Sequence, residues 1–155
     1  MKRLELAEVT GVIIHCAATK PKMDIGAKEI KDWHLKRGWS DIGYHWVIRR
    51  DGKIETGRSS NLIGAHCKGQ NSHNIGICLV GGIDEKGKPE NNFTDEQWFS
   101  LIGFLKGLPL TYPNIENITG HNEHSNKACP SFDVQEWKKE FNIYFKNPIQ
   151  DEKKS

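Results

Sequence analysis

The stretch NIGICLV at residues 74–80 is apolar almost throughout. Strands that are covered on both faces have such continuous apolar runs, whereas half-buried strands alternate between apolar and polar residues. Gly81 and Gly82 follow directly and end the run. We therefore expect residues 74–80 to form a central strand of a sheet with packed layers on both sides.

Three further segments have strand character. Residues 9–16, VTGVIIHC, are apolar and β-branched, which predicts a buried strand. In residues 43–58, two β-type runs flank Asp51-Gly52, a dipeptide that suits a tight hairpin turn. Residues 118–121 form a short strand or strand end. Together these segments predict a mixed sheet of about five strands.

Three segments have helical character. Residues 26–37 have apolar and boundary positions at helical spacing, with Gly38 as a stop. A capping box at residues 94–97 opens a second helix, which we expect to end before Pro109. A third begins after Asp133. The predicted fold class is therefore α/β, a single domain at residues 1–147 followed by a polar tail at 148–155.

Composition excludes several function classes. The 155 residues carry 22 basic and 20 acidic side chains, which gives a net charge of +2 without a basic face for direct nucleic-acid binding. No apolar run is long enough for a secretory signal or a transmembrane span, so we expect cytoplasmic synthesis and no membrane insertion.

The four cysteines have no close pair in the sequence. In a reducing compartment, free thiols or metal ligands are expected rather than disulfides. Cys16 and Cys78 lie in apolar strands and are expected to be packing residues. For Cys67, the sequence pattern does not distinguish a buried from an exposed position.

A candidate metal site lies in residues 120–132, GHNEHSNKACPSF. His121 and Cys129 are both good zinc ligands, but two ligands do not fill a zinc shell. His15 stands at the end of a predicted buried strand, which positions a ligand more rigidly than a loop does. From the residues alone His15, His66 and His124 all stay open as the third ligand.

Six motifs resemble one known family. They are HCAATKP at 15–21, GWSDIGYHWVIRRDGKIETGR at 38–58, GAHCKGQN at 64–71, NIGICLVGGID at 74–84, FTDEQ at 93–97 and KACPSFD at 127–133. Together they resemble the zinc-dependent N-acetylmuramoyl-L-alanine amidases, whose fold is shared with peptidoglycan recognition proteins. The first and last motifs are specific to the short phage amidases of that family.

The resemblance implies one Zn²⁺ ion held by His15, His121 and Cys129, with Tyr44 and Lys127 assisting catalysis beside it. Cys129 marks the phage branch, since the family also has members that use an aspartate in place of the cysteine. Two residues depart from the family pattern without touching this set. Asn74 replaces the usual serine, and His124 stands where no histidine is expected.

The implied reaction is hydrolysis of the amide between N-acetylmuramic acid and L-alanine of peptidoglycan. Lys127 would stabilise the developing oxyanion, and Tyr44 would orient the attacking water or share in proton transfer. His66 and Asn71 lie on a loop expected to border the cleft, so they are predicted substrate-binding residues. The alternative for Asn71 is a set of loop-stabilising hydrogen bonds.

Two rival functions belong to other classes. A recognition module would bind peptidoglycan without cutting it, but such modules lose zinc ligands that are all present here. Short phage amidases are also associated with inhibition of the phage single-subunit RNA polymerase. The resemblance therefore implies that polymerase as a second partner of this chain. We expect a monomer that acts on the bacterial cell wall after release across the inner membrane.

Overall fold

The predicted central strand forms β4 (Asn74–Leu79), the middle strand of a five-stranded sheet in the computed structural model. The sheet order is β3-β2-β4-β1-β5, where the other strands are β1 (Gly11–Cys16), β2 (Trp46–Ile48), β3 (Ile54–Thr56) and β5 (Asn117–Gly120). All neighbouring pairs are parallel except β2 and β3, which form the antiparallel hairpin. The expected mixed sheet is confirmed.

The structure describes residues 1–145. Their helices are α1 (Ala27–Lys36), α2 (Asp95–Thr111) and α3 (Val134–Phe141), with short 3₁₀ turns η1 (Leu6–Glu8) and η2 (His121–Glu123). The three predicted helices are therefore present. The predicted tail at 148–155 and its boundary lie outside the described residues, so the division at residue 147 stays a proposal.

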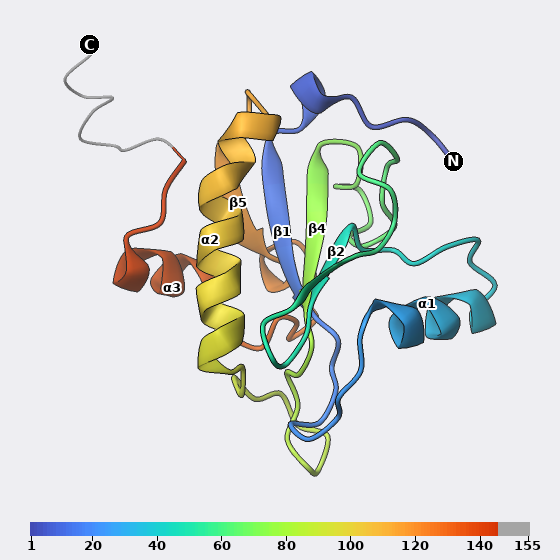
Figure 1. The fold of residues 1–155 in the computed structure, drawn as a ribbon, viewed down its shortest axis with the longest axis vertical. Coiled ribbons are helices and arrows are strands. Elements are labelled where there is room, and N and C mark those ends of the chain that lie inside the picture. Colours follow the sequence, from blue (N-terminus) through green and yellow to red (C-terminus); the bar gives the residue numbers. More distant parts are fainter. Residues whose placement is uncertain (146–155) are drawn as a thin grey trace.

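The helices cover opposite faces of the sheet, and Figure 1 shows α2 and α3 together on one side and α1 on the other. The α2 and α3 side holds the larger core, in which Ile14 and Ile77 of the sheet pack with Leu105 of α2. The α1 side holds a smaller apolar cluster of five buried residues, Ile30, Ile42, Val47, Cys78 and Val80. The stability of the sheet therefore rests mainly on the α2 and α3 side.

The start of α2 follows the predicted capping box. Thr94 Oγ1 accepts a hydrogen bond from the Gln97 backbone N–H, and the Gln97 side chain accepts one from the Thr94 N–H. The end of α2 differs from the prediction, because the helix continues through Pro109 to Thr111. Proline removes one N–H donor, but Pro109 lies in the last turn, where the Tyr112 N–H donates to Leu108 O at 2.8 Å. Burial of Tyr112 anchors this final turn.

Tyr44 departs from the simple strand alternation. Such alternation along 44–48 predicts Tyr44, Trp46 and Ile48 on one face. Trp46 and Ile48 do belong to the core on the α2 side, but Tyr44 packs against the cluster on the α1 side. The prediction is wrong for Tyr44 because β2 begins only at Trp46, so the regular pleat does not extend back to it.

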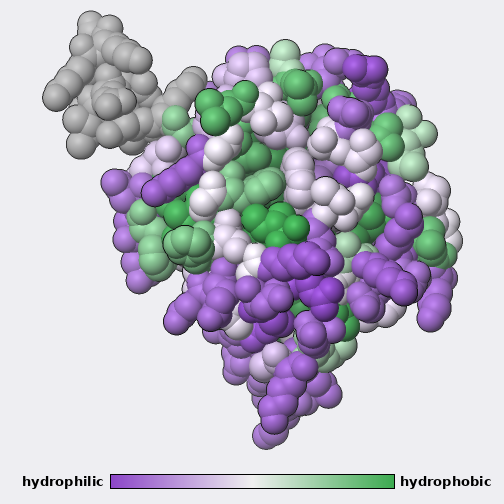
Figure 2. All heavy atoms as spheres, in the orientation of Figure 1, coloured by the Kyte–Doolittle hydropathy of each residue, from purple (hydrophilic) through white to green (hydrophobic). Residues whose placement is uncertain are grey.

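Hydrophobic side chains also reach the surface, and Figure 2 shows several of them in the upper half of the view. On α2, Phe99 is 83% exposed and Leu110 is 93% exposed. Within residues 1–145, none of the helices has the length and apolar character needed to cross a membrane.

Candidate metal centre

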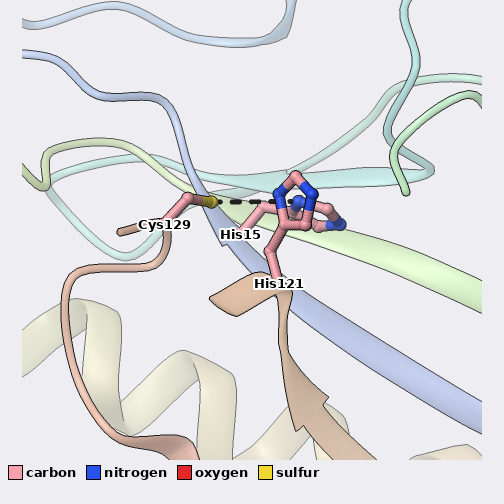
Figure 3. A group of neighbouring side chains, drawn as sticks. All are labelled: His15, His121 and Cys129. Carbon is pink, nitrogen blue, oxygen red and sulfur yellow. Dashed lines mark hydrogen bonds between the residues drawn. The ribbon is translucent and has the colours of Figure 1, made fainter. Parts of the chain in front are cut away.

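Three potential metal ligands meet at the carboxyl ends of two parallel strands. His15 is the penultimate residue of β1, and His121 directly follows β5. Cys129 lies in the segment that leads to α3. One ligand atom from each of these residues lies within 4.8 Å of the other two, and Figure 3 shows the three side chains pointing toward one another. The carboxyl edge of the sheet is where open α/β folds place ligand sites.

The order of the strands explains why residues far apart in sequence converge. β1 pairs with β5 in a parallel register that matches Ile14 with Gly120, so His15 and His121 leave the ladder at the same level. Their ring centroids are 4.7 Å apart. The Cys16 backbone N–H donates a hydrogen bond to Cys129 Sγ at 3.1 Å, which ties the third ligand to the end of β1.

His15 is fully buried, and its two ring nitrogens face different partners. Nδ1 lies 3.9 Å from Cys129 Sγ, on the side of the candidate metal position. Nε2 lies 2.9 Å from His66 Nδ1. Burial, followed by the charges of His66 and His121, lowers the pKa of His15 well below its ordinary value. The imidazole is therefore neutral, which is the form that binds metal.

The other two ligands have perturbed pKa values as well. Burial, followed by the charge of Lys127, lowers the pKa of His121 and keeps it neutral. The hydrogen bond with the Cys16 thiol, followed by burial, raises the pKa of the Cys129 thiol. Since only a thiolate coordinates a metal, binding would release the Cys129 proton.

Tyr44 lies against the ligand set. Its ring centroid is 5.0 Å from that of His15. Burial raises the pKa of the Tyr44 phenol well above its ordinary value, with the Cys78 thiol as the next cause. The hydroxyl is therefore protonated at neutral pH and is available as a hydrogen-bond donor.

A pocket of about 430 Å³ opens beside His121. Its lining includes Lys127 and Lys68, two exposed cations, together with His66, Cys67, His121, His124 and Ser125. The charge of Lys127 contributes to the lowered pKa of both His15 and His121, as expected for a cation close to the ligands. Of the three candidate ligands, His121 therefore lies at the wall of a positively charged pocket.

The remaining predicted site residues have clear positions. His66 is 8% exposed, and its ring nitrogens contact His15 and the Asn74 carbonyl. Asn71 Oδ1 accepts hydrogen bonds from the backbone N–H groups of His66 and Cys67, which is the loop-stabilising alternative. Direct substrate contacts of His66 and Asn71 stay predictions.

His124 is exposed and lies outside the ligand group, with its Nε2 2.8 Å from Thr119 Oγ1. The four cysteines are free, and Cys67 is buried rather than exposed. Sequence reasoning missed the contacts of His66 with His15 and of Cys16 with Cys129. The motif at residues 64–71 marked the loop, but no pattern in it points to a histidine on β1.

Comparison with known proteins agrees with this fold. The sequence profile of the N-acetylmuramoyl-L-alanine amidase family matches residues 5–132. The chain therefore belongs to the N-acetylmuramoyl-L-alanine amidase family, and the resemblance carried by its motifs is confirmed.

Among similar proteins, the endolysin of Enterobacteria phage K11 is 52% identical over 132 residues, which cover 85% of this chain and 87% of the phage protein. Among solved structures, the N-acetylmuramoyl-L-alanine amidase LysC from Clostridium intestinale URNW aligns with a TM-score of 0.74 and 30% identity, covering 92% of this chain and 91% of LysC. The bumblebee peptidoglycan recognition protein PGRP-SA shares the fold, with a TM-score of 0.73 and 23% identity over 90% of this chain and 84% of that one.

Proposed function

We propose that this chain is a phage endolysin that hydrolyses the amide bond between N-acetylmuramic acid and L-alanine of peptidoglycan, and that it depends on zinc. Family membership supports the amidase activity. The observation that carries the zinc dependence is the convergence of His15, His121 and Cys129 within 4.8 Å. His121 of this group also lines an open pocket.

The donor set fits zinc. One thiolate and two neutral imidazoles are borderline-soft ligands, which suit Zn²⁺ better than the oxygen-seeking Mg²⁺ or Ca²⁺. Three protein ligands are typical of a catalytic zinc site, since structural sites fill all four positions with protein. When bound, zinc supplies Lewis-acid activation of water and of the scissile carbonyl.

Lys127 contributes the charge that the reaction needs. Attack on an amide carbonyl places negative charge on its oxygen, and a cation positioned there lowers the barrier. Lys127 lines the pocket beside His121 and is exposed, so its ammonium group can reach a substrate in the pocket. We assign Lys127 to stabilisation of the oxyanion.

Tyr44 contributes a neutral hydroxyl. Its raised pKa argues against a phenolate base at neutral pH, so the residue acts as a hydrogen-bond donor toward water or the carbonyl oxygen. Its packing against His15 also holds the ligand ring from one side.

Digestion of purified peptidoglycan tests this proposal. The full chain is incubated with peptidoglycan as purified, with a chelator, and with the chelator followed by excess Zn²⁺. We expect new L-alanine amino termini, their loss with the chelator and their return with zinc. New reducing sugar ends would instead mean a glycosidase, and full activity in the chelator would contradict the zinc dependence.

The expected partner is peptidoglycan, and the expected place of action is the bacterial cell wall. Cytoplasmic synthesis, release across the inner membrane and a monomeric state stay predictions. Inhibition of a phage single-subunit RNA polymerase also stays a prediction. A pulldown with the cognate polymerase tests it, and an absence of binding would remove this second role.

A further inference from the structure

The ligand ring of His15 is held by a chain of two hydrogen bonds that ends on the backbone. His15 Nε2 lies 2.9 Å from His66 Nδ1, and His66 Nε2 lies 3.2 Å from Asn74 O. His15 and His66 are both buried. Asn74 begins β4, directly beside β1 in the sheet.

The carbonyl at the end of this chain determines where each proton lies. Asn74 O can only accept a hydrogen bond, so His66 Nε2 must carry a proton. A neutral imidazole carries a single N–H, so with Nε2 protonated the Nδ1 of a neutral His66 is an acceptor. The free lone pair on Nδ1 therefore accepts a hydrogen bond from the Nε2–H of His15. His15 Nδ1 is then the unprotonated nitrogen, and it is the one that faces Cys129.

Three local features keep His66 in this position. Asn71 Oδ1 accepts from the backbone N–H groups of His66 and Cys67, which fixes the loop where the His66 side chain begins. The Asn74 side chain donates to Gln70 O at 2.9 Å and closes the same loop against β4. Gly76 leaves room for the ring, since a Cβ there would lie 2.6 Å from His66 Cγ.

We propose that His66 is a positioning residue that sets the tautomer and orientation of His15, so that Nδ1 of His15 is presented to the metal. This inference rests on the proposed zinc site, because it concerns how one ligand of that site is prepared. Metal-binding histidines commonly donate their second ring N–H to an acceptor, and loss of that acceptor costs about 10- to 100-fold in metal affinity. Here the acceptor is a second histidine, which is itself oriented by a backbone carbonyl.

The test combines the tautomer of His15 with zinc affinity in the full chain. Nitrogen-15 NMR of the zinc-free wild-type chain should show the proton on Nε2 in both His15 and His66. Zinc titration against a competing chelator then compares His66→Phe, which removes the acceptor, with His66→Gln, whose amide can accept from His15 and donate to Asn74 O. We expect about 10- to 100-fold weaker binding in His66→Phe and recovery to within a few-fold in His66→Gln.

A matched control separates positioning from general destabilisation. His45 is 1% exposed and also uses both ring nitrogens, accepting from the Gly76 N–H and donating to Leu62 O. His45→Phe should lower the melting temperature as His66→Phe does, while zinc affinity and the His15 tautomer stay at wild-type values.

The outcomes distinguish this inference from the proposed function. Wild-type zinc affinity in His66→Phe, or equal weakening in His66→Phe and His66→Gln, would overturn the role of His66. A proton on His15 Nδ1 in the wild-type spectra would overturn it without any variant. If the wild-type chain bound no zinc, the proposed function would fail, and the tautomers of the zinc-free chain would still decide the inference.

Discussion

The two faces of the sheet differ sharply in what they bury. Toward α2 and α3, strand β1 contributes Ile14 to a large apolar core, in which Leu105 is fully buried. Toward the opposite face, the next residue of the same strand is His15, which meets Tyr44 and His66 instead of an apolar layer. Because side chains alternate along a strand, one strand serves packing on one side and chemistry on the other.

This division has a testable consequence. Substitutions on the α2 and α3 side should change stability and leave zinc affinity intact, whereas substitutions around His15 should change zinc affinity or turnover with smaller effects on stability.

Removal of a ligand gives the largest change. Cys129→Ala should lose tight zinc binding and lower amidase activity by about 10³-fold or more, because Lewis-acid activation contributes several kcal/mol. Zinc content by elemental analysis and release of L-alanine amino termini measure the two effects. The control is Cys67→Ala, which removes a different thiol that is buried and lines the pocket beside His121. Equal loss of zinc in the control would argue against the assigned ligand set.

On the opposite face, Leu105→Ala should lower the free energy of unfolding by about 2–5 kcal/mol, through lost burial and the cavity left behind. Denaturant unfolding measures this value. At temperatures below the transition, zinc affinity should equal that of the wild type. Leu110→Ala is the matched control, since this leucine of the same helix is 93% exposed and should have little effect. A loss of zinc affinity in the folded Leu105→Ala variant would break the proposed separation of the faces.

Lys127→Ala should lower turnover by about 10²- to 10³-fold, the usual effect of removing a group that stabilises an oxyanion. Zinc content and melting temperature should not change, because Lys127 is exposed and is not a ligand. Lys68→Ala, which removes the other exposed lysine of the pocket, should have a clearly smaller effect on turnover. Equal losses in the two variants would indicate a general effect of pocket charge.

The buried histidines should also make stability depend on pH. Burial lowers the pKa of His45 below its unfolded value of about 6.5, so the unfolded chain binds more protons as the pH falls. The free energy of unfolding should therefore fall below about pH 6.5, by up to about 1.4 kcal/mol per pH unit for such a histidine. His45→Gln, which cannot titrate, should show a shallower dependence in denaturant unfolding. Parallel pH profiles would exclude a contribution from His45.

Local patterns predicted much of the fold. The apolar run at 74–80, the hairpin around Asp51-Gly52 and the capping box of α2 each depend on neighbouring residues, and all three are observed. The end of α2 and the face of the sheet on which Tyr44 packs were predicted wrongly. Both depend on tertiary contacts, namely the anchoring of Tyr112 and the late start of β2.

The site was only partly predictable from the residues. Local chemistry indicated His121 and Cys129 as candidate ligands but left His15, His66 and His124 open as the third, because the strand order that brings β1 beside β5 has no local signal. The family resemblance selected His15. The role of His66 could not be found from sequence, since it depends on a backbone carbonyl of β4 that lies next to the loop only after folding.

X-ray absorption at the zinc edge of the zinc-loaded chain measures the ligand shell itself. We expect one zinc ion per chain with one sulfur ligand and two histidine nitrogens, and loss of the sulfur signal in Cys129→Ala. A zinc shell with no sulfur, or with more than one, would contradict the assignment of His15, His121 and Cys129 as the metal site.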